Sequence, residues 1–254
     1  MAGGGDAGLS LDGFLGGRVR VWQPKRGYRA ATDPVFLAAS IPARPGQSVL
    51  DLGCGVGTAA LCLGRRIGGL ELHGLEIQPD YAALARRNGE ENGIPLVVHE
   101  GSVAAMPAAL RQLTFDHVMM NPPYLRAGAA TAPADAGKGR ANLGAAEALG
   151  EWIAAGLRRL RQGGCLTVIH RPEALGEILA AAGDSAGDTR VLPIAPRTCR
   201  NAGRVLVQTR KGRRAPLRIL WPFVVHDGDA HDRDADNFTE KARDILRNMV
   251  NLSL

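Results

Sequence analysis

The chain has 254 residues, of which 45% are hydrophobic and 22% charged, an ordinary globular composition that is long enough for one large domain. The net charge of +6 and the sequence pI near 9.5 fit a polyanionic partner without establishing one. No charged segment followed by an apolar run opens the chain, and no apolar stretch approaches membrane-spanning length, so we expect a soluble, cytoplasmic protein. The four cysteines form no CxxC pair and have no histidine at zinc spacing, so neither disulfides nor a metal site is expected.

Taken in chain order, residues 1–13 are rich in glycine and alanine and are predicted to be disordered, and residues 14–254 to form a single domain. A lead-in over 14–47 contains a short strand at 19–22 and a helix that starts at Asp33. Apolar runs after it predict seven strands, at 48–52, 70–77, 95–99, 115–120, 164–170, 188–194 and 204–210. Helical stretches lie at 58–67, 80–92, 103–112, 147–161 and 172–182.

This alternation predicts an α/β core over 48–212, a mostly parallel sheet with helices on both faces. In the C-terminal extension, 213–254, residues 215–225 are expected to add a strand and 239–248 a last helix. The low-complexity segment 126–143 follows the fourth strand and is predicted to be a loop beside the site.

The first strand of the predicted sheet ends in Asp51-Leu52-Gly53-Cys54-Gly55-Val56-Gly57. Glycines two positions apart let the backbone turn tightly and leave its amides open to a ligand. A dinucleotide fingerprint would need a small residue at position 58, which is Thr58 here. Asp51 disfavours a pyrophosphate and favours the cationic sulfonium and amino groups of S-adenosylmethionine. The second strand ends in Glu76-Ile77, where an acid can accept hydrogen bonds from a ribose diol, so this pattern predicts an S-adenosylmethionine site.

The fourth strand stops at Asn121-Pro122-Pro123-Tyr124, because two prolines cannot continue a sheet ladder. The lone pair of an adenine or glutamine amino nitrogen is delocalised, so the nitrogen must be drawn toward tetrahedral geometry before it attacks a methyl group. The Asn121 side-chain oxygen and the Pro122 carbonyl can each accept one N–H, which aims the lone pair, and Tyr124 can stack on the planar group. The corner therefore predicts methylation of a planar amino nitrogen, with Asn121, Pro122 and Tyr124 as catalytic residues.

These segments resemble class I, Rossmann-like S-adenosylmethionine-dependent methyltransferases of the N6-adenine and glutamine-amide type. The resemblance implies a seven-stranded sheet with the last strand antiparallel. It also implies a set of cofactor-binding residues, namely Asp51, Gly53, Cys54, Gly55, Gly57, Glu76, Ile77 and Asn121. One departure is Ser102, which stands where relatives carry an acid toward the cofactor's adenine and which can still hydrogen-bond there.

The lead-in narrows the resemblance. Its motif comprises Gln23, Gly27-Tyr28-Arg29, Thr32-Asp33 and the run from Val35 to Ala39, and the tail carries Val224-Val225-His226 and Asn237-Phe238-Thr239-Glu240. Both are similar to the bacterial tRNA1(Val) adenine N6-methyltransferase family, over roughly residues 14–250. The likeness implies that Tyr28, Thr32 and Asp33 pack over the cofactor, and that the substrate is the adenine beside the anticodon of a tRNA.

A basic run without acids extends from Arg197 to Arg218. A solvated face is the plain interpretation, and an RNA substrate makes the run a phosphate-binding surface. The predicted RNA-binding residues are Arg197, Arg200, Arg210, Lys211, Arg213 and Arg214.

Several alternatives stay open from sequence. A protein glutamine N5-methyltransferase of the release-factor type shares the Asn-Pro-Pro-Tyr corner, although about forty-seven residues before the first strand are too few for its usual helical domain. An rRNA or DNA adenine methyltransferase is another candidate, and a non-catalytic nucleic-acid-binding module is disfavoured by the intact Asn121 and Tyr124. Which adenine is methylated, and whether the chain is a monomer or a homodimer, also stay open.

Overall fold

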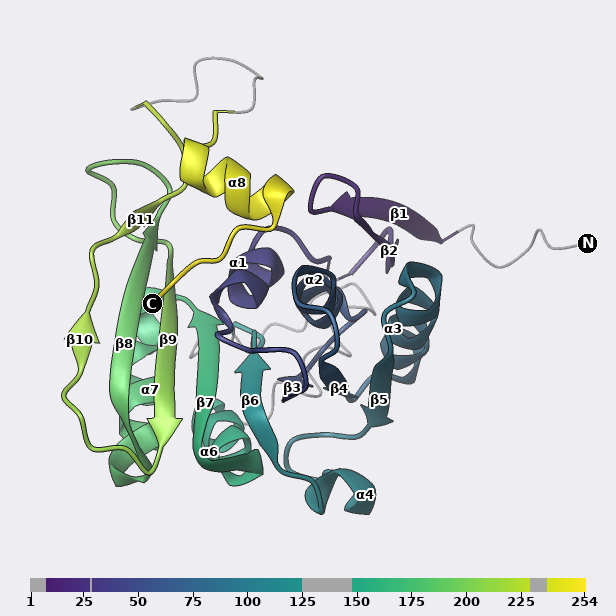
Figure 1. The fold of residues 1–254 in the computed structure, drawn as a ribbon, viewed down its shortest axis with the longest axis horizontal. Coiled ribbons are helices and arrows are strands. Elements are labelled where there is room, and N and C mark those ends of the chain that lie inside the picture. Colours follow the sequence, from purple (N-terminus) through teal and green to yellow (C-terminus); the bar gives the residue numbers. More distant parts are fainter. Residues whose placement is uncertain (1–7, 28, 125–147, 229–236) are drawn as a thin grey trace, which may run out of the picture.

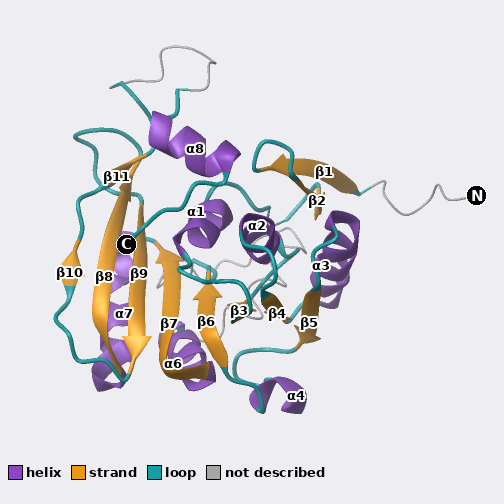
Figure 2. Ribbon diagram, in the orientation of Figure 1, coloured by secondary structure: helices purple, strands orange, loops and turns teal. Residues whose placement is uncertain are grey.

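The computed structural model describes residues 8–27, 29–124, 148–228 and 237–254. They form a twisted sheet with helices on both faces, preceded by a two-stranded hairpin (Figure 1; Figure 2). The main strands are β3 (Ser48–Leu52), β4 (Glu71–Glu76), β5 (Leu96–Glu100), β6 (Phe115–Met120), β7 (Leu160–His170), β8 (Ala186–Ala195) and β9 (Arg204–Lys211). The predicted segment 126–143 lies outside the described residues.

The sheet has the order β10-β8-β9-β7-β6-β3-β4-β5. Strands β3 to β7 pair in parallel, whereas β9 runs antiparallel to both β7 and β8. These seven strands match the seven predicted ones and give the expected Rossmann-like arrangement with an antiparallel last strand. Two further strands of two residues each, β10 (Arg218–Ile219) and β11 (Phe223–Val224), pair with β8, so the expected strand in 215–225 is split and the sheet has nine strands.

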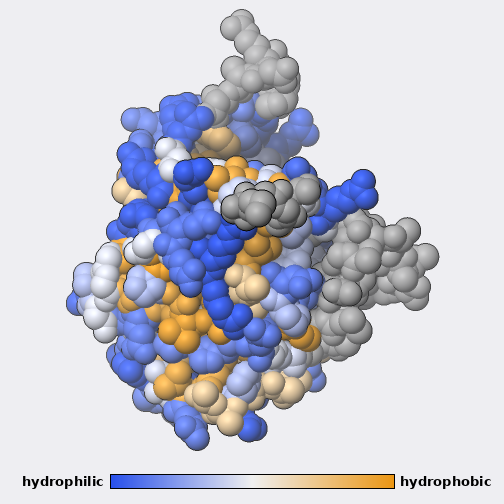
Figure 3. All heavy atoms as spheres, turned by 90° about the vertical axis from the view of Figure 1, so that its right-hand side faces the viewer, coloured by the Kyte–Doolittle hydropathy of each residue, from blue (hydrophilic) through white to orange (hydrophobic). Residues whose placement is uncertain are grey.

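The core lies in two layers because successive side chains of a strand point to opposite faces. Met119 of β6 belongs to the layer under α1 (Asp33–Ser40), α2 (Thr58–Arg66) and α8 (Glu240–Asn248). Its neighbours Val118 and Met120 belong to the layer under α6 (Leu149–Arg159) and α7 (Leu175–Ala182), which lie behind the sheet in Figure 1. Helix α3 (Pro79–Asn92) packs against β5 at the far edge. Both hydrophilic and apolar side chains are exposed on this side of the molecule (Figure 3). Val97 of β5 is 51% exposed.

The prediction of disorder over 1–13 is wrong for residues 9–13. Strand β1 (Leu9–Phe14) pairs antiparallel with β2 (Val19–Pro24), and residues 1–7 lie outside the described part. The hairpin is held from a distance: fully buried Asn88 of α3 accepts a hydrogen bond from the Trp22 amide at 2.8 Å and donates to the Val56 carbonyl at 2.9 Å. A local reading of glycine content misses this contact.

The helix expected at 103–112 is also largely wrong. Only α4 (Ala108–Arg111) forms, and it begins directly after Pro107. Proline lacks the amide hydrogen that a helix interior needs and disfavours helical geometry in the residue before it. Residues 101–107 are therefore a loop beyond the end of β5.

Candidate functional site

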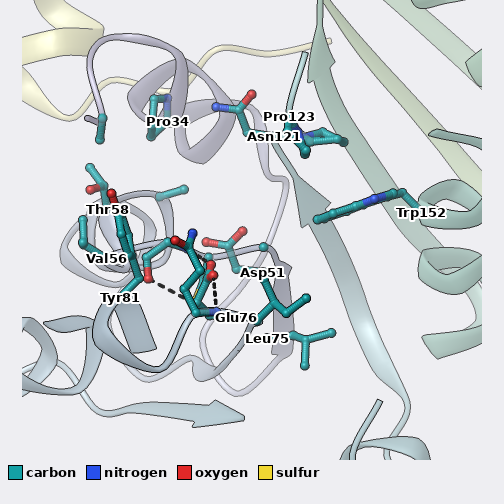
Figure 4. Close-up of a pocket in the computed structure, with 18 of the residues that line it drawn as sticks. Pro34, Asp51, Val56, Thr58, Leu75, Glu76, Tyr81, Asn121, Pro123 and Trp152 are labelled. Atoms are coloured by element: carbon teal, nitrogen blue, oxygen red, sulfur yellow. Dashed lines mark hydrogen bonds between the residues drawn. The ribbon is translucent and has the colours of Figure 1, made fainter. Parts of the chain in front are cut away.

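A cavity of about 500 Å³ opens at the carboxyl ends of β3, β4, β5 and β6. Strand order reverses between β3 and β6, the switch point at which such sheets bind ligands. In Figure 4, Asn121, Pro123 and Trp152 lie on one side of the cavity and Val56, Thr58 and Tyr81 on the other, with Asp51 and Glu76 between them. No group of three potential metal ligands occurs among the described residues, and no helix within the same ranges is long and apolar enough to span a membrane.

The glycine loop after β3 turns through left-handed backbone at Gly53, Gly55 and Gly57, with φ of +70°, +57° and +88°. A side chain at Gly53 would also meet the Trp152 ring at 2.8 Å, so this glycine admits the indole to the cavity wall. Gly53, Cys54 and Gly55 line the cavity. Gly57 was predicted to bind the cofactor, but it is not among the cavity-lining residues: it caps α2 and packs against Leu96 and Ala85.

Two buried carboxylates form the floor of the cavity. Asp51 Oδ2 has no hydrogen-bond partner among the described residues, and burial raises the pKa of Asp51 to about 8, opposed by an Ala60 backbone hydrogen bond and reinforced by the charge of Glu76. Burial also raises the pKa of Glu76, although its two oxygens accept hydrogen bonds from the Gly55 and Gln78 amides at 2.9 and 2.8 Å (Figure 4). Glu76 is thus held in one orientation, while Asp51 presents an unsatisfied acceptor that a cation would satisfy.

The remaining predicted cofactor residues from the strand ends lie at the same cavity. Ile77 follows β4 and is 38% exposed, and Ser102 follows β5, where its Oγ accepts a hydrogen bond from the Ala105 amide at 3.0 Å. The Ser102 hydroxyl keeps its own proton to donate, which a carboxylate at this position would lack.

The Asn121-Pro122-Pro123-Tyr124 corner lines the cavity directly after β6. The Tyr124 hydroxyl lies 2.9 Å from Asn121 Oδ1 and 2.9 Å from Asp33 Oδ2. Its ring meets His170 edge-on at 4.8 Å, with the Arg171 and Arg204 guanidinium carbons 5.2 and 4.9 Å from the ring centroid. A planar group that stacks on Tyr124 must therefore share the ring with these two cations or replace one of them.

The lead-in reaches the cavity through Gly27, Arg29, Ala30 and Pro34. Thr32 and Asp33, two of the predicted cofactor residues, do not line it. Thr32 caps α1, and the Asp33 carboxylate pairs instead with Arg204 at 2.7 Å. Tyr28 lies outside the described residues.

The predicted RNA-binding run does not form one surface. Arg197 and Arg200 lie in the loop between β8 and β9, at the carboxyl edge of the sheet with the cavity. Strand β9 then runs away from the cavity, so Arg210, Lys211, Arg213 and Arg214 lie at the opposite edge, with Lys211 about 23 Å along the strand from Arg204. Arg210 is 3.8 Å from Asp188, and Lys211 donates to the Leu160 carbonyl at 2.9 Å.

Sequence reasoning missed further residues of the site, among them Arg171 and Trp152 at the cavity and Arg204 beside Tyr124. Arg171 lines it directly after β7, a position that the strand-end rule could have flagged. Trp152 is only 8% exposed and belongs to the core, but it also forms part of the cavity wall. Arg204 reaches Tyr124 from β9, and no local signal marks it among the other arginines of the run.

Many curated proteins and solved structures resemble this chain, among them three relatives and one crystal structure. A tRNA1(Val) (adenine(37)-N6)-methyltransferase of Actinobacillus succinogenes is 31% identical over 46% of this chain and 50% of that protein. A release factor glutamine methyltransferase of Geobacter sulfurreducens is 36% identical over 38% of this chain and 33% of that protein. The chain thus aligns with half or less of these two relatives, whereas a tRNA1(Val) (adenine(37)-N6)-methyltransferase of Dickeya chrysanthemi is 27% identical over 95% of this chain and 96% of that protein.

The crystal structure of a predicted O-methyltransferase, protein Atu636 from Agrobacterium tumefaciens, has a TM-score of 0.71 and 27% identity over 87% of this chain and 99% of that chain. Residues 31–179, more than half of the chain, match the family model described as methyltransferase small domain. This range contains the glycine loop, Asp51, Glu76 and the Asn121 corner, so the part of the chain that matches the family model supplies these residues of the cavity. The chain belongs to the methyltransferase small domain family.

Proposed function

We propose that this protein transfers a methyl group from S-adenosylmethionine to the exocyclic N6 of an adenine in RNA, namely the adenine beside the anticodon of a tRNA. The observation that carries the proposal is the Asn121 corner at the wall of a cavity whose floor holds Asp51 and Glu76. The proposal includes a cytoplasmic location, since its substrate is a tRNA.

The residues of the cavity fit the cofactor. The buried Asp51 Oδ2 has no hydrogen-bond partner in the described ranges, and a cationic ligand would stabilise its ionised form. Glu76, fixed by two backbone amides, still has lone pairs for a ribose diol, because each carboxylate oxygen accepts two hydrogen bonds. When bound, the cofactor supplies an electrophilic methyl group on a sulfonium.

The residues of this chain would supply orientation. The Asn121 side chain and the Pro122 carbonyl each accept one hydrogen bond from the substrate amino group, which aims its lone pair at the methyl group. Tyr124 holds the planar base, and the indole of Trp152 closes the cavity wall beside the glycine loop. The leaving thioether is neutral, so positioning rather than a general base carries the rate.

The arginines around Tyr124 favour RNA over a protein glutamine. Arg171 lines the cavity, Arg204 lies against the Tyr124 ring, and exposed Arg200 lies in the loop just before β9. Phosphates flanking a flipped adenine give Arg171 and Arg200 partners, whereas a neutral glutamine amide does not; Arg204 is already paired with Asp33. Near full-length similarity to a tRNA1(Val) (adenine(37)-N6)-methyltransferase supports the same choice.

Incubation with labelled S-adenosylmethionine and a mixture of total tRNA, rRNA and a release factor tests the proposal. We expect label in the tRNA fraction, recovered after nuclease digestion as N6-methyladenosine, and no label with the Asn121→Ala variant. Label in the release factor alone would replace the proposal with glutamine methylation, the function of the second relative.

A further inference from the structure

A chain of polar contacts stands behind Asn121 and joins three distant parts of the sequence. Arg204, the first residue of β9, holds Asp33 with its Nε 2.7 Å from Asp33 Oδ2. The same Asp33 oxygen lies 2.9 Å from the Tyr124 hydroxyl, which lies 2.9 Å from Asn121 Oδ1. Asp33 is the first residue of α1, so the contacts connect that helix, β9 and the corner after β6.

Counting protons decides the direction of these hydrogen bonds. A phenol carries one proton, and a carboxylate carries none, so the Tyr124 hydroxyl donates to Asp33. Burial lowers the pKa of Arg204, but the hydrogen bonds and charges of Asp33 and Tyr124 outweigh it and hold the pKa above its ordinary value, so the guanidinium stays charged beside the Asp33 carboxylate. A Tyr124 oxygen whose proton points at Asp33 can only accept from Asn121.

An asparagine amide has the same shape with its oxygen and nitrogen exchanged, and the hydrogen-bond network determines which end points where. The end that faces Tyr124 must therefore be the NH2 group, and the carbonyl oxygen occupies the other end. Asn121 lines the cavity, so this orientation directs an acceptor rather than a donor to the substrate side. An amino group that is to be methylated needs an acceptor there.

We propose that Asp33, held by Arg204, is a positioning residue that acts through the Tyr124 hydroxyl to fix the Asn121 amide with its carbonyl oxygen toward the substrate amino group. The inference rests on the proposed function, in which Asn121 and the Pro122 carbonyl accept hydrogen bonds from the substrate amino group. It gives Asp33 a task other than cofactor contact and gives the Tyr124 hydroxyl a task separate from the stacking of its ring.

A substrate-free measurement tests the orientation directly. The side-chain NH2 proton signal of ¹⁵N-labelled Asn121, identified by its loss in Asn121→Ala, is expected to move upfield in Tyr124→Phe, because the NH2 group loses its acceptor, and to move in Asp33→Asn as well. It should not move in the control Glu240→Gln, which removes an exposed first-turn carboxylate from α8 instead of α1. A signal that stays in place in Tyr124→Phe overturns the inference, whether or not the protein methylates RNA.

Kinetics test the consequence. Tyr124→Phe, which keeps the ring, and Asp33→Asn should each lower kcat about 10- to 100-fold, with the cofactor Kd within about twofold of the parent value. Because both act through one amide, the double variant should be no slower than the slower single variant. If the decreases of kcat in the two single variants multiplied in the double variant, the two residues would act independently. A lower melting temperature with an unchanged kcat would show that the contact between Tyr124 and Asp33 is only structural. If the parent protein transferred no methyl group to RNA, the proposed function would be wrong. The NH2 signal would still test the orientation of the Asn121 amide.

Discussion

Cofactor affinity should depend steeply on pH through Asp51. Burial raises the pKa of Asp51 to about 8, against an ordinary value near 3.8, so most of the cofactor-free protein should carry a neutral Asp51 at pH 7. A cationic cofactor favours the ionised form, so binding expels the proton. If the cation binds only the ionised form, the apparent Kd should weaken about 10-fold from pH 9 to pH 7 and about 100-fold from pH 9 to pH 6.

Isothermal titration with S-adenosylmethionine across pH 6–9 measures this slope, and Asp51→Asn provides the matched control. The variant should bind weakly at every pH, and any slope left in it belongs to the amino group of the ligand. A parent Kd that stays level across the range, or an equal slope in Asp51→Asn, would refute the assignment of Asp51 to the cation.

The same carboxyl gives a stability prediction whose sign follows from linkage. The folded pKa is raised, so the contribution of Asp51 to stability is fully present below about pH 4 and is lost as the pH rises through about 8. Without cofactor, the melting temperature of the parent should fall more between pH 5 and pH 9 than that of Asp51→Asn. Saturating cofactor should remove most of this difference, because it binds the ionised form.

Three further predictions concern the rest of the site. Asn121→Ala should lower kcat at least about 100-fold with cofactor Kd nearly unchanged. A variant with the parental rate would show that Asn121 does not position the substrate amino group. Gly53→Ala should destabilise the fold by about 1–3 kcal/mol in denaturant melts, because φ is +70° and a Cβ would meet Trp152 at 2.8 Å; Gly176→Ala, with open space at its Cβ, is the control. Replacing Arg171 and Arg200 by Gln should raise KM for tRNA and reduce the slope of log affinity against log salt concentration by about one to two units. The double variant Arg213→Ala, Arg214→Ala should have smaller effects on both quantities. Larger effects in that variant would indicate that the RNA binds at the opposite edge of the sheet.

The sheet could be predicted because its strands are buried on both faces and read as continuous apolar runs, as at Ser48–Leu52, where every residue is buried. The errors fall where a distant partner or a single proline decides the local structure. Residues 9–14 form a strand because they pair with β2. Strand β2 is in turn anchored by Asn88, which lies more than sixty residues further along the chain. Pro107 shortens a helix that composition alone would extend.

Residues at strand ends could be predicted for the same topological reason, since Asp51, Glu76, Ser102 and Asn121 each follow or end a strand. The contact between Asp33 and Arg204 could not, because 171 positions separate the two residues and neither lies in a motif that names the other. The basic run illustrates a different error. An antiparallel last strand was expected, and a run that continues through such a strand must pass from one edge of the sheet to the other.

The cavity is divided electrostatically along the order of the strands. The ends of β3 and β4 supply the carboxylates of Asp51 and Glu76, whereas Arg171 lines the cavity next to Tyr124 at the end of β7; Arg204, beside the same ring, is paired with Asp33. A cationic ligand would be stabilised beside the carboxylates, and an anionic ligand beside the arginine. If the two ligands exchanged places, each would lie next to groups of its own charge. A sulfonium cofactor and a nucleotide have this pair of charges, and a sulfonium cofactor and a glutamine amide do not. The division therefore favours a nucleic-acid substrate on grounds independent of the Asn121 corner, which serves both kinds of amine equally.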